Sequence, residues 1–278
     1  MAEAYCRAGK HRRLQRLRHP DSGAIFLVPL DHSLADGPVA DTENFASLVE
    51  AMANNGVDGL VVHKGRVRFL RPELLRDLSL IVHLNGSTRY APDANAKILV
   101  GSVEEAVALG ADAVSVHVNI GSDNEAAQLI DLGKVSDQAA HWGVPLLAMV
   151  YPRGPHLTNP ADPALLAHAA NIAADLGADI VKLPYTGSVS TMVDVVHASP
   201  IPIVTAGGGV VAETEKLLDG ITDAMASGVA GVAVGRNVFG AADPGHTARL
   251  IAQRVHATAP PPDLLPAERQ MDRETTFS

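Results

Sequence analysis

One short phrase recurs along the chain wherever a helical pattern gives way to an apolar run. Its copies read GVDG, GADAVSV, GADIVK and GVAGVAV, and their first glycines are residues 56, 110, 177 and 228. A glycine at this point suits the left-handed residue that ends a helix, and an apolar run follows it closely. Repetition of this turn predicts an α/β protein in which helices lead into the strands of a parallel sheet.

Eight short runs rich in Val, Ile and Leu lie between about residues 24 and 240. Helical patterns separate them, for example at 43–55, 103–109, 124–142, 163–176 and 212–227. Strands that are apolar on both faces belong in a parallel sheet covered by helices. Eight units in series predict a single (β/α)8 TIM barrel rather than an open sheet. The expected strands are 24–30, 58–63, 78–84, 112–118, 145–151, 179–183, 201–206 and 231–235.

We expect three parts in the chain. Residues 1–23 form an N-terminal helical arm, residues 24–258 form the barrel, and residues 259–278 form a Pro-rich C-terminal tail without periodicity. The basic cluster GKHRRLQRLR near the N-terminus is interpreted as a solvated helix rather than as a functional basic patch. The stretch TRYAPDANAK, residues 88–97, is expected to be a long loop above one end of the barrel.

Composition excludes several classes of function. The net charge of −9 argues against a nucleic-acid partner, because phosphate binding needs clustered Lys and Arg. Cys6 is the only cysteine, which leaves no intramolecular disulfide and no thiolate metal cluster. The first residues lack the apolar core of a signal peptide, and no apolar run reaches the roughly 18 residues of a membrane span. We therefore expect a cytoplasmic protein with no membrane partner.

Polar groups stand at the end of nearly every predicted strand, whereas the opposite ends carry plain turns. Buried polar groups cost energy unless they are paired, so stability alone does not explain this asymmetry. In barrel enzymes the chemistry lies at the carboxyl ends of the strands, and we expect the active site there. The strand ends read PLDHS, VVHKG, VHLNG, VHVNIGS, YPRG, DIVKL, TAGGG and VGRN.

The last two strand ends predict a phosphate site. In phosphate-binding barrels the loops after strands 7 and 8, with the helix N-terminus that follows, hold the phosphate. The run AGGG (206–209) lets backbone N–H groups approach closely, and GRN (235–237) adds a guanidinium. Either glycine run alone would indicate only a tight turn. A dinucleotide fold is disfavoured, because no GxGxxG follows the first strand.

Lys182 ends the sixth predicted strand, where an ammonium is costly. Desolvation favours the neutral amine, which can condense with a ketone to an iminium that acts as an electron sink. Alternatively, Lys182 pairs with a barrel carboxylate or holds a substrate phosphate. Lys64, in HKG, is the competing candidate, whereas Lys97 is expected before a helix on the far side of a loop.

An iminium mechanism also needs groups that move protons. Tyr151, from the fifth strand, is a suitable acid or base at the same rim, and Asp31, from the first strand, is a suitable carboxylate. A tyrosine that only packs and an aspartate that caps a loop are the simpler interpretations of these two residues. Their shared rim with Lys182 favours the catalytic interpretation.

Four histidines at the first four strand ends suggest a rival chemistry. His32, His63, His83 and His117 could bind zinc or another divalent ion if their imidazoles converged. Against this, the sequence has no HxH pair, and strands 5 and 6 supply no histidine. We therefore expect no metal ligands in the site, and a hydrogen-bonded role for each histidine.

Six stretches of the chain resemble the archaeal-type class I aldolases. They are PLDHSLADGP, HVNIGSDNEAA, MVYPRG, DIVKLPYTG, AGGG and GVAVGRNVF, and the resemblance runs from about residue 15 to residue 257. They are most similar to the branch of the 2-amino-3,7-dideoxy-D-threo-hept-6-ulosonate synthases and the related aldolases of aminohydroxybenzoate biosynthesis. The resemblance implies a (β/α)8 barrel, a Schiff base formed without metal or other cofactor, and a homo-oligomer such as a decamer.

The resemblance also implies roles for individual residues. Lys182 would form the Schiff base, Tyr151 would donate a proton and Asp31 would accept one. The chain departs from the family at Ser33 and at the LP of KLPYTG, and we expect both departures at the mouth of the site. Substrate and phosphate would be bound by Asp31, His32, Ser33, Leu34, Ala35, Tyr151, Pro152, Arg153, Gly207, Gly208, Gly235 and Arg236.

The resulting hypothesis is a class I aldolase or transaldolase for small molecules. It would join a fragment derived from a ketose phosphate to an aldehyde such as aspartate semialdehyde, in aromatic amino acid or aminohydroxybenzoate biosynthesis. Fructose-bisphosphate aldolase is the first alternative. Further alternatives are a thiolase that transfers an acyl group from an autoinducer to coenzyme A, a metal-dependent barrel enzyme, and a catalytically inactive scaffold in an oligomer.

Overall fold

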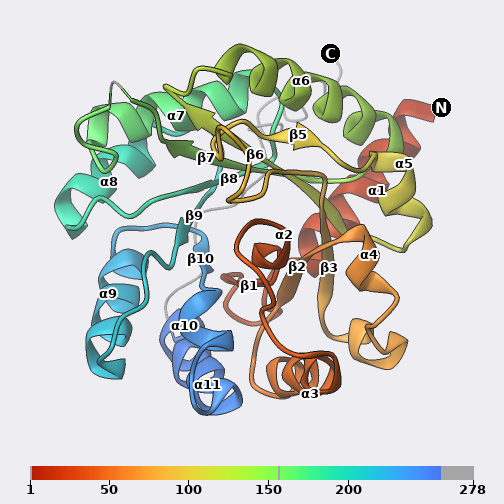
Figure 1. The fold of residues 1–278 in the computed structure, drawn as a ribbon, viewed down its shortest axis with the longest axis vertical. Coiled ribbons are helices and arrows are strands. Elements are labelled where there is room, and N and C mark those ends of the chain that lie inside the picture. Colours follow the sequence, from red (N-terminus) through yellow and green to blue (C-terminus); the bar gives the residue numbers. More distant parts are fainter. Residues whose placement is uncertain (1, 156, 258–278) are drawn as a thin grey trace, which may run out of the picture.

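Eight parallel strands close into a barrel that helices surround (Figure 1). The computed structural model describes residues 2–155 and 157–257, the side chains of residues 2–7, 42 and 43 excepted. The predicted (β/α)8 fold is confirmed, whereas the predicted C-terminal tail lies outside the described residues. In barrel order the strands are β1 (Ile25–Pro29), β2 (Gly59–His63), β3 (Ser79–His83), β6 (Ala113–Ile120), β7 (Leu146–Pro152), β8 (Ile180–Leu183), β9 (Ile203–Ala206) and β10 (Gly231–Ala233).

The helices follow the predicted pattern closely. The five glycines expected to end helices all have a left-handed backbone, with φ between 61° and 85° at Gly56, Gly110, Gly143, Gly177 and Gly228. None of the described helices is long and apolar enough to cross a membrane. The longer helices are α1 (Ala2–Arg16), α3 (Thr42–Ala53), α5 (Val103–Ala108), α6 (Glu125–Trp142), α7 (Pro163–Asp175), α8 (Val189–Ala198), α9 (Thr214–Ala226) and α11 (Pro244–Val255), and the short ones are α2 (His32–Ala35), α4 (Lys64–Val67), η1 (Pro72–Arg76) and α10 (Arg236–Phe239).

Side chains alternate along each strand between the barrel interior and the layer under the helices. The interior is filled by aliphatic side chains, because successive residues of a strand point to opposite faces. The outer layer, rich in Val, Leu and Ala, forms a larger core with the helices. The interior residues are Ile25, Leu27, Val61, Ile81, Ala113, Leu147, Met149, Ile180, Val204 and Ala233, joined from below by Leu17.

The aspartate of the recurring phrase ties neighbouring strands together at the amino end of the barrel. Asp58 accepts a hydrogen bond from the backbone N–H of Phe26 at 2.6 Å. Asp112 and Asp179 do the same two and four strands further on, at 2.9 Å from Leu80 N and 2.8 Å from Leu146 N. The fourth copy of the phrase has alanine in place of the aspartate. The repeat thus encodes a strand clamp as well as a turn.

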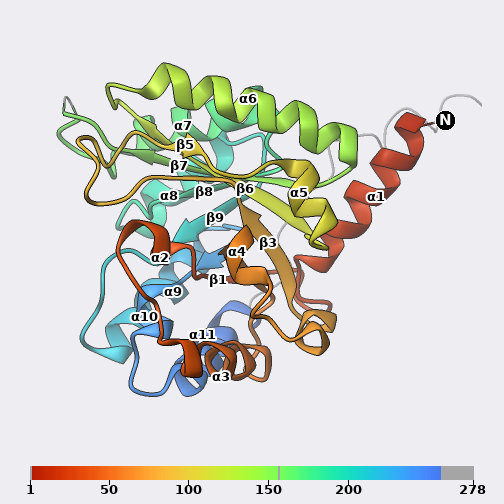
Figure 2. The same ribbon diagram turned by 45° about the vertical axis from the view of Figure 1, so that its right-hand side comes forward.

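Helix α1 closes the same end of the barrel. Figure 2 shows it across the molecule from the loop between β4 (Asn85–Gly86) and β5 (Ile98–Leu99), which pair antiparallel. Lys10 pairs with Asp179 at 2.9 Å and Arg16 with Asp112 at 2.7 Å, on the aspartates that clamp the strands. The basic cluster is helical, as expected, but these two charges dock the helix rather than face only water. The boundaries of the arm at residue 23 and of the barrel at 258 stay predictions.

The seam between β1 and β10 leaves no room for a side chain at Gly231, whose partner in register is Ile25. A Cβ there would fall on the Ile25 carbonyl group, 2.7 Å from its carbon and 2.8 Å from the backbone nitrogen. We expect Gly231→Ala to lower the free energy of unfolding by about 3 kcal/mol, as overpacking does.

Urea unfolding followed by circular dichroism measures this loss. Gly133→Ala is the matched control, because a Cβ on that α6 glycine meets nothing within 4 Å. It should stabilise the protein by up to about 1 kcal/mol, the difference in helix propensity. Equal midpoints for wild type and Gly231→Ala would contradict the tight seam.

Candidate active site

A cavity of about 940 Å³ opens at the carboxyl ends of the strands. The alternation of side chains that fills the barrel interior also directs polar side chains into this cavity. Two residues beyond an aliphatic interior position come the side chains of His63, His83, Tyr151 and Lys182, and Asp31 comes four residues beyond Leu27. All five line the cavity. The predicted site residues that line it are Asp31, His32, Leu34, Ala35, Tyr151, Pro152, Arg153, Lys182, Gly207, Gly208, Gly235 and Arg236.

Lys182 is buried at the floor of this cavity and is only 6% exposed. Its register partners are Met149 on β7 and Val204 on β9, so its neighbours across the sheet are apolar. Its Nζ lies 4.0 Å from the Met149 sulfur and 6.0 Å from the centre of the Tyr151 ring. Among the described residues no carboxylate lies within ion-pair distance of the ammonium, which disfavours the structural ion pair considered above.

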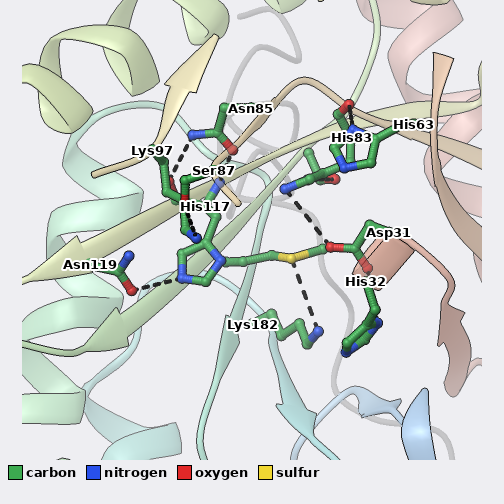
Figure 3. A network of polar contacts seen from close by, with 12 residues as sticks. Asp31, His32, His63, His83, Asn85, Ser87, Lys97, His117, Asn119 and Lys182 are labelled. Atoms are coloured by element: carbon green, nitrogen blue, oxygen red, sulfur yellow. Dashed lines mark hydrogen bonds and ion pairs between the residues drawn. The ribbon is translucent and has the colours of Figure 1, made fainter. Parts of the chain in front are cut away.

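Asp31 faces Lys182 from the other side of the cavity floor (Figure 3). Its Oδ2 lies 3.9 Å from His83 Nε2 and its Oδ1 lies 3.6 Å from His32 Nδ1. Burial alone would raise the pKa of this carboxyl, but interactions with His83, His32 and Lys182 outweigh it and lower the pKa to about 2. Asp31 is therefore an ionised carboxylate at neutral pH.

Two polar atoms at this point have no hydrogen-bond partner within the described part of the chain. They are Asp31 Oδ1 and His32 Nδ1, both buried. Unpaired buried polar atoms are expensive in a structural core and are found where a site is arranged for a ligand. Their position beside Lys182 marks the place for a polar group of a substrate.

The four histidines at the strand ends are neutral, and two of them are hydrogen-bonded to neighbouring side chains. Burial lowers the pKa of His32, of His63 and of His117, and it lowers the pKa of His83 to about 4. His83 Nδ1 lies 2.8 Å from Ser115 Oγ, and His117 Nε2 lies 2.8 Å from Asn119 Oδ1. Within residues 2–155 and 157–257 no three His, Cys, Asp or Glu side chains are arranged to hold a metal ion.

Tyr151 is held by its ring and leaves its hydroxyl free of intramolecular bonds in the described structure. The ring packs on His117 with centroids 4.9 Å apart, and the Arg153 guanidinium lies 4.8 Å above it. β7 pairs directly with β8, so Tyr151 and Lys182 stand on neighbouring strands, as the sequence predicted. These contacts orient the phenol along the cavity wall.

The glycine turn after β9 and the start of α10 form the opposite wall of the cavity. Arg236 donates to the Gly208 carbonyl at 2.7 Å, and Gly208 has the left-handed φ of 67° that the turn requires. Asn237, which the sequence reasoning did not use, accepts from Val211 N at 2.8 Å and donates to Gly209 O at 2.9 Å. At Gly235 a Cβ would lie 2.6 Å from the Pro29 carbonyl oxygen, so glycine is required there as well.

The structure places some of the residues singled out from the sequence outside the cavity. Ser33 does not line the cavity, because α2 turns it away between His32 and Leu34. Leu183 packs in the outer layer, and of the LP pair only Pro184 faces the cavity. Lys64, the rival to Lys182, lies on α4 outside the cavity and binds Glu105 at 2.9 Å.

Lys97 lies at the end of a loop and before a helix, as expected, but it also lines the cavity, a position that the sequence did not suggest. It ends the loop between β4 and β5, a stretch without periodicity from which its direction could not be read. Its Nζ donates to Ser87 Oγ at 2.7 Å and to the Ala94 carbonyl at 2.9 Å. In Figure 3 it enters on the side of His117 and Asn119, with Asp31 and His32 on the other side of Lys182.

Comparisons with known proteins agree with this geometry. A model of the DeoC/LacD aldolase family matches residues 25–241. A 2-amino-4,5-dihydroxy-6-oxo-7-(phosphonooxy)heptanoate synthase of Streptomyces griseus is 51% identical over 244 residues, which cover 88% of this chain and 89% of the relative. A 2-amino-3,7-dideoxy-D-threo-hept-6-ulosonate synthase 1 of Archaeoglobus fulgidus is 43% identical, with 89% and 91% covered.

Solved structures match over most of the chain as well. A crystal structure of an archaeal fructose 1,6-bisphosphate aldolase has a TM-score of 0.81 and 31% identity, with 90% of this chain and all of that chain covered. Another structure of an archaeal fructose-1,6-bisphosphate aldolase, with the catalytic lysine covalently bound to the carbinolamine intermediate of the substrate, has a TM-score of 0.80 and 30% identity, with 89% and 99% covered. These matches confirm the resemblance seen in the strand-end motifs, and the chain belongs to the DeoC/LacD family of aldolases.

Proposed function

We propose that the protein is a Schiff-base aldolase that joins dihydroxyacetone phosphate to aspartate semialdehyde, with Lys182 as the nucleophile. The observation that carries the proposal is the burial of this lysine among apolar neighbours, with no carboxylate within ion-pair distance among the described residues. An amine in such surroundings is not held in an ion pair, so its nitrogen can attack the carbonyl carbon of a bound ketone. Solved relatives at about 30% identity are Schiff-base aldolases, which supports the same chemistry.

The donor would bind with its phosphate against the glycine turn of β9 and Arg236 at the start of α10. Backbone N–H groups and a guanidinium are the donors that phosphate oxygens prefer. The donor carbonyl carbon then lies toward Lys182, whose amine adds to it to give a carbinolamine. Tyr151 would donate the proton with which the carbinolamine hydroxyl leaves as water, and an iminium remains.

Asp31 would take up the proton that the donor loses when the iminium becomes an enamine. A carboxylate with a pKa of about 2 is a weak base, but the iminium acidifies the neighbouring C–H bond. The enamine carbon attacks the acceptor aldehyde, forming the new C–C bond, and the resulting alkoxide takes back the proton that Asp31 holds. Water then adds to the iminium, and the free amine of Lys182 is restored as the product leaves.

The choice of substrates follows from the product named for the Streptomyces relative. In a 2-amino-4,5-dihydroxy-6-oxo-7-(phosphonooxy)heptanoate the aldol bond joins carbons 4 and 5, because carbon 5 is next to the ketone and carbon 4 carries the new hydroxyl. Cleavage of that bond gives dihydroxyacetone phosphate and the semialdehyde of aspartate. The Archaeoglobus relative is named for a product that lacks the phosphate, and it is less similar to this chain.

A direct assay of the purified protein tests this function. With dihydroxyacetone phosphate as donor, we expect kcat/KM to be at least about tenfold higher for aspartate semialdehyde than for glyceraldehyde 3-phosphate. Mass spectrometry of the seven-carbon or six-carbon product identifies the acceptor. A preference for glyceraldehyde 3-phosphate would support the alternative function, fructose-bisphosphate aldolase. That activity is named for the solved structures to which this chain is similar at a TM-score of about 0.8.

A further inference from the structure

The cavity has a second cationic end, remote from Arg236. Lys97 and Arg153 both line it there, beside His117 and Tyr151. Burial and the charge of Arg153 lower the pKa of Lys97, which indicates that the two cations repel one another. Within the described part of the chain, neither has a carboxylate at ion-pair distance. Two cations that face one cavity, neither of them paired with a carboxylate, are unfavourable for stability alone.

The wall that carries Lys97 is rigidly built. Asn119, fully buried, donates to the Asn95 carbonyl at 2.8 Å, and Gln128, 1% exposed, donates to the same oxygen at 3.1 Å. Asp93 accepts from the Asn95 backbone N–H at 2.8 Å. Through these bonds, side chains of β6 and α6 hold the loop between β4 and β5. The backbone that carries Lys97 is therefore positioned by buried side chains.

Lys97 has one N–H left after its bonds to Ser87 and Ala94. No glycine turn like that of β9 lies beside it to surround a phosphate with backbone N–H groups. A single ammonium N–H and the Arg153 guanidinium suit the two oxygens of a carboxylate. Nearby, Asp36 also lines the cavity, and its charge raises the pKa of Lys97, in opposition to burial.

We propose that Lys97 and Arg153 bind the carboxylate of the acceptor aldehyde, and that Asp36 binds its α-ammonium group. The acceptor class is then a short zwitterionic amino-acid aldehyde, with its aldehyde carbon directed toward Lys182. This assignment rests on the proposed aldolase function and adds to it the groups that select the acceptor. Donor phosphate and acceptor carboxylate would occupy opposite ends of one cavity, with the reacting carbons between them.

Binding of L-homoserine, the unreactive alcohol analogue of aspartate semialdehyde, tests the subsite without turnover. Isothermal calorimetry should show binding to wild-type protein that Lys97→Met weakens tenfold to hundredfold, the usual effect of a lost charge-assisted hydrogen bond. Lys64→Met is the matched control and should bind as wild type does, because Lys64 lies outside the cavity. Absence of wild-type binding at millimolar concentration overturns the subsite. The subsite is also overturned if Lys97→Met loses the binding of inorganic phosphate but still binds homoserine as wild type does, because Lys97 would then hold a phosphate.

Steady-state kinetics with two aldehydes distinguish a role of Lys97 in binding the acceptor from a role in supporting the fold. With saturating dihydroxyacetone phosphate, Lys97→Met should raise KM for aspartate semialdehyde tenfold or more and change kcat/KM for uncharged propanal less than about threefold. Equal losses with both aldehydes would show that Lys97 only supports the fold. If the wild type turns over neither aldehyde while homoserine binding still depends on Lys97, the aldolase proposal fails and the subsite stands. If the variant is active and its KM for aspartate semialdehyde is unchanged, the subsite fails and the aldolase proposal stands.

Discussion

Lys182→Met should be inactive, with kcat reduced by a factor of about 10⁴ or more, because the nucleophile that carries the substrate is gone. Methionine is close in length to lysine and suits the apolar floor that Met149 and Val204 provide. The variant should therefore fold, and should unfold at a higher temperature than wild type, since a buried amine has been replaced by an apolar group. Steady-state kinetics and thermal unfolding measure the two effects.

Borohydride reduction identifies the residue that reacts. With dihydroxyacetone phosphate present, it should convert the iminium to a stable secondary amine and add mass to the tryptic peptide that contains Lys182. Lys182→Met should not be labelled, whereas the control Lys64→Met should be labelled as wild type is. A label on Lys64, or undiminished labelling of Lys182→Met, would show that another lysine is the nucleophile.

Tyr151→Phe should lower kcat by about 10²- to 10³-fold, the usual contribution of a positioned general acid or base. The substitution removes only the hydroxyl. The ring contacts with His117 at 4.9 Å and with the Arg153 guanidinium at 4.8 Å remain available to phenylalanine. The cavity wall should therefore keep its shape, and the loss can be attributed to proton transfer.

Rapid-quench single-turnover experiments on Tyr151→Phe separate the steps. Donor binding should be nearly unchanged, while dehydration of the carbinolamine becomes slow and adducts short of the iminium accumulate. These adducts appear in the intact mass but resist reduction by borohydride. A kcat within about tenfold of wild type would contradict the role of Tyr151 as the proton donor.

The barrel was predictable because its signals are local and repeated. Each strand is a short apolar run, and each of five helices stops at a glycine whose left-handed φ any other residue would resist. The first and last observed strand residues differ from the predicted ones by no more than two positions. What the repeat did not reveal was the task of its aspartate, because a bond from Asp58 to Phe26 joins residues on different strands.

The site divides in the same way. Lys182, Tyr151 and Asp31 were found because strand periodicity fixes which side chains face inward at the carboxyl ends. Lys97 was missed because its loop has no period and its direction depends on Asn119 and Gln128, which belong to other elements. Positions set by long-range hydrogen bonds carry no local pattern in a sequence.

The two-residue ladder of β4 and β5 has a consequence for how such a protein can change. Asn85 pairs with Leu99 and Gly86 with Ile98, so the loop that brings Lys97 begins and ends at one point of the wall. The length and sequence of this loop can vary without moving any strand of the barrel, because each added residue raises the entropic cost of loop closure only slightly. A change in this loop can thus alter which acceptor aldehyde is bound while Lys182 stays in place. Replacing this one loop is therefore a route to new carbon–carbon bond-forming reactions.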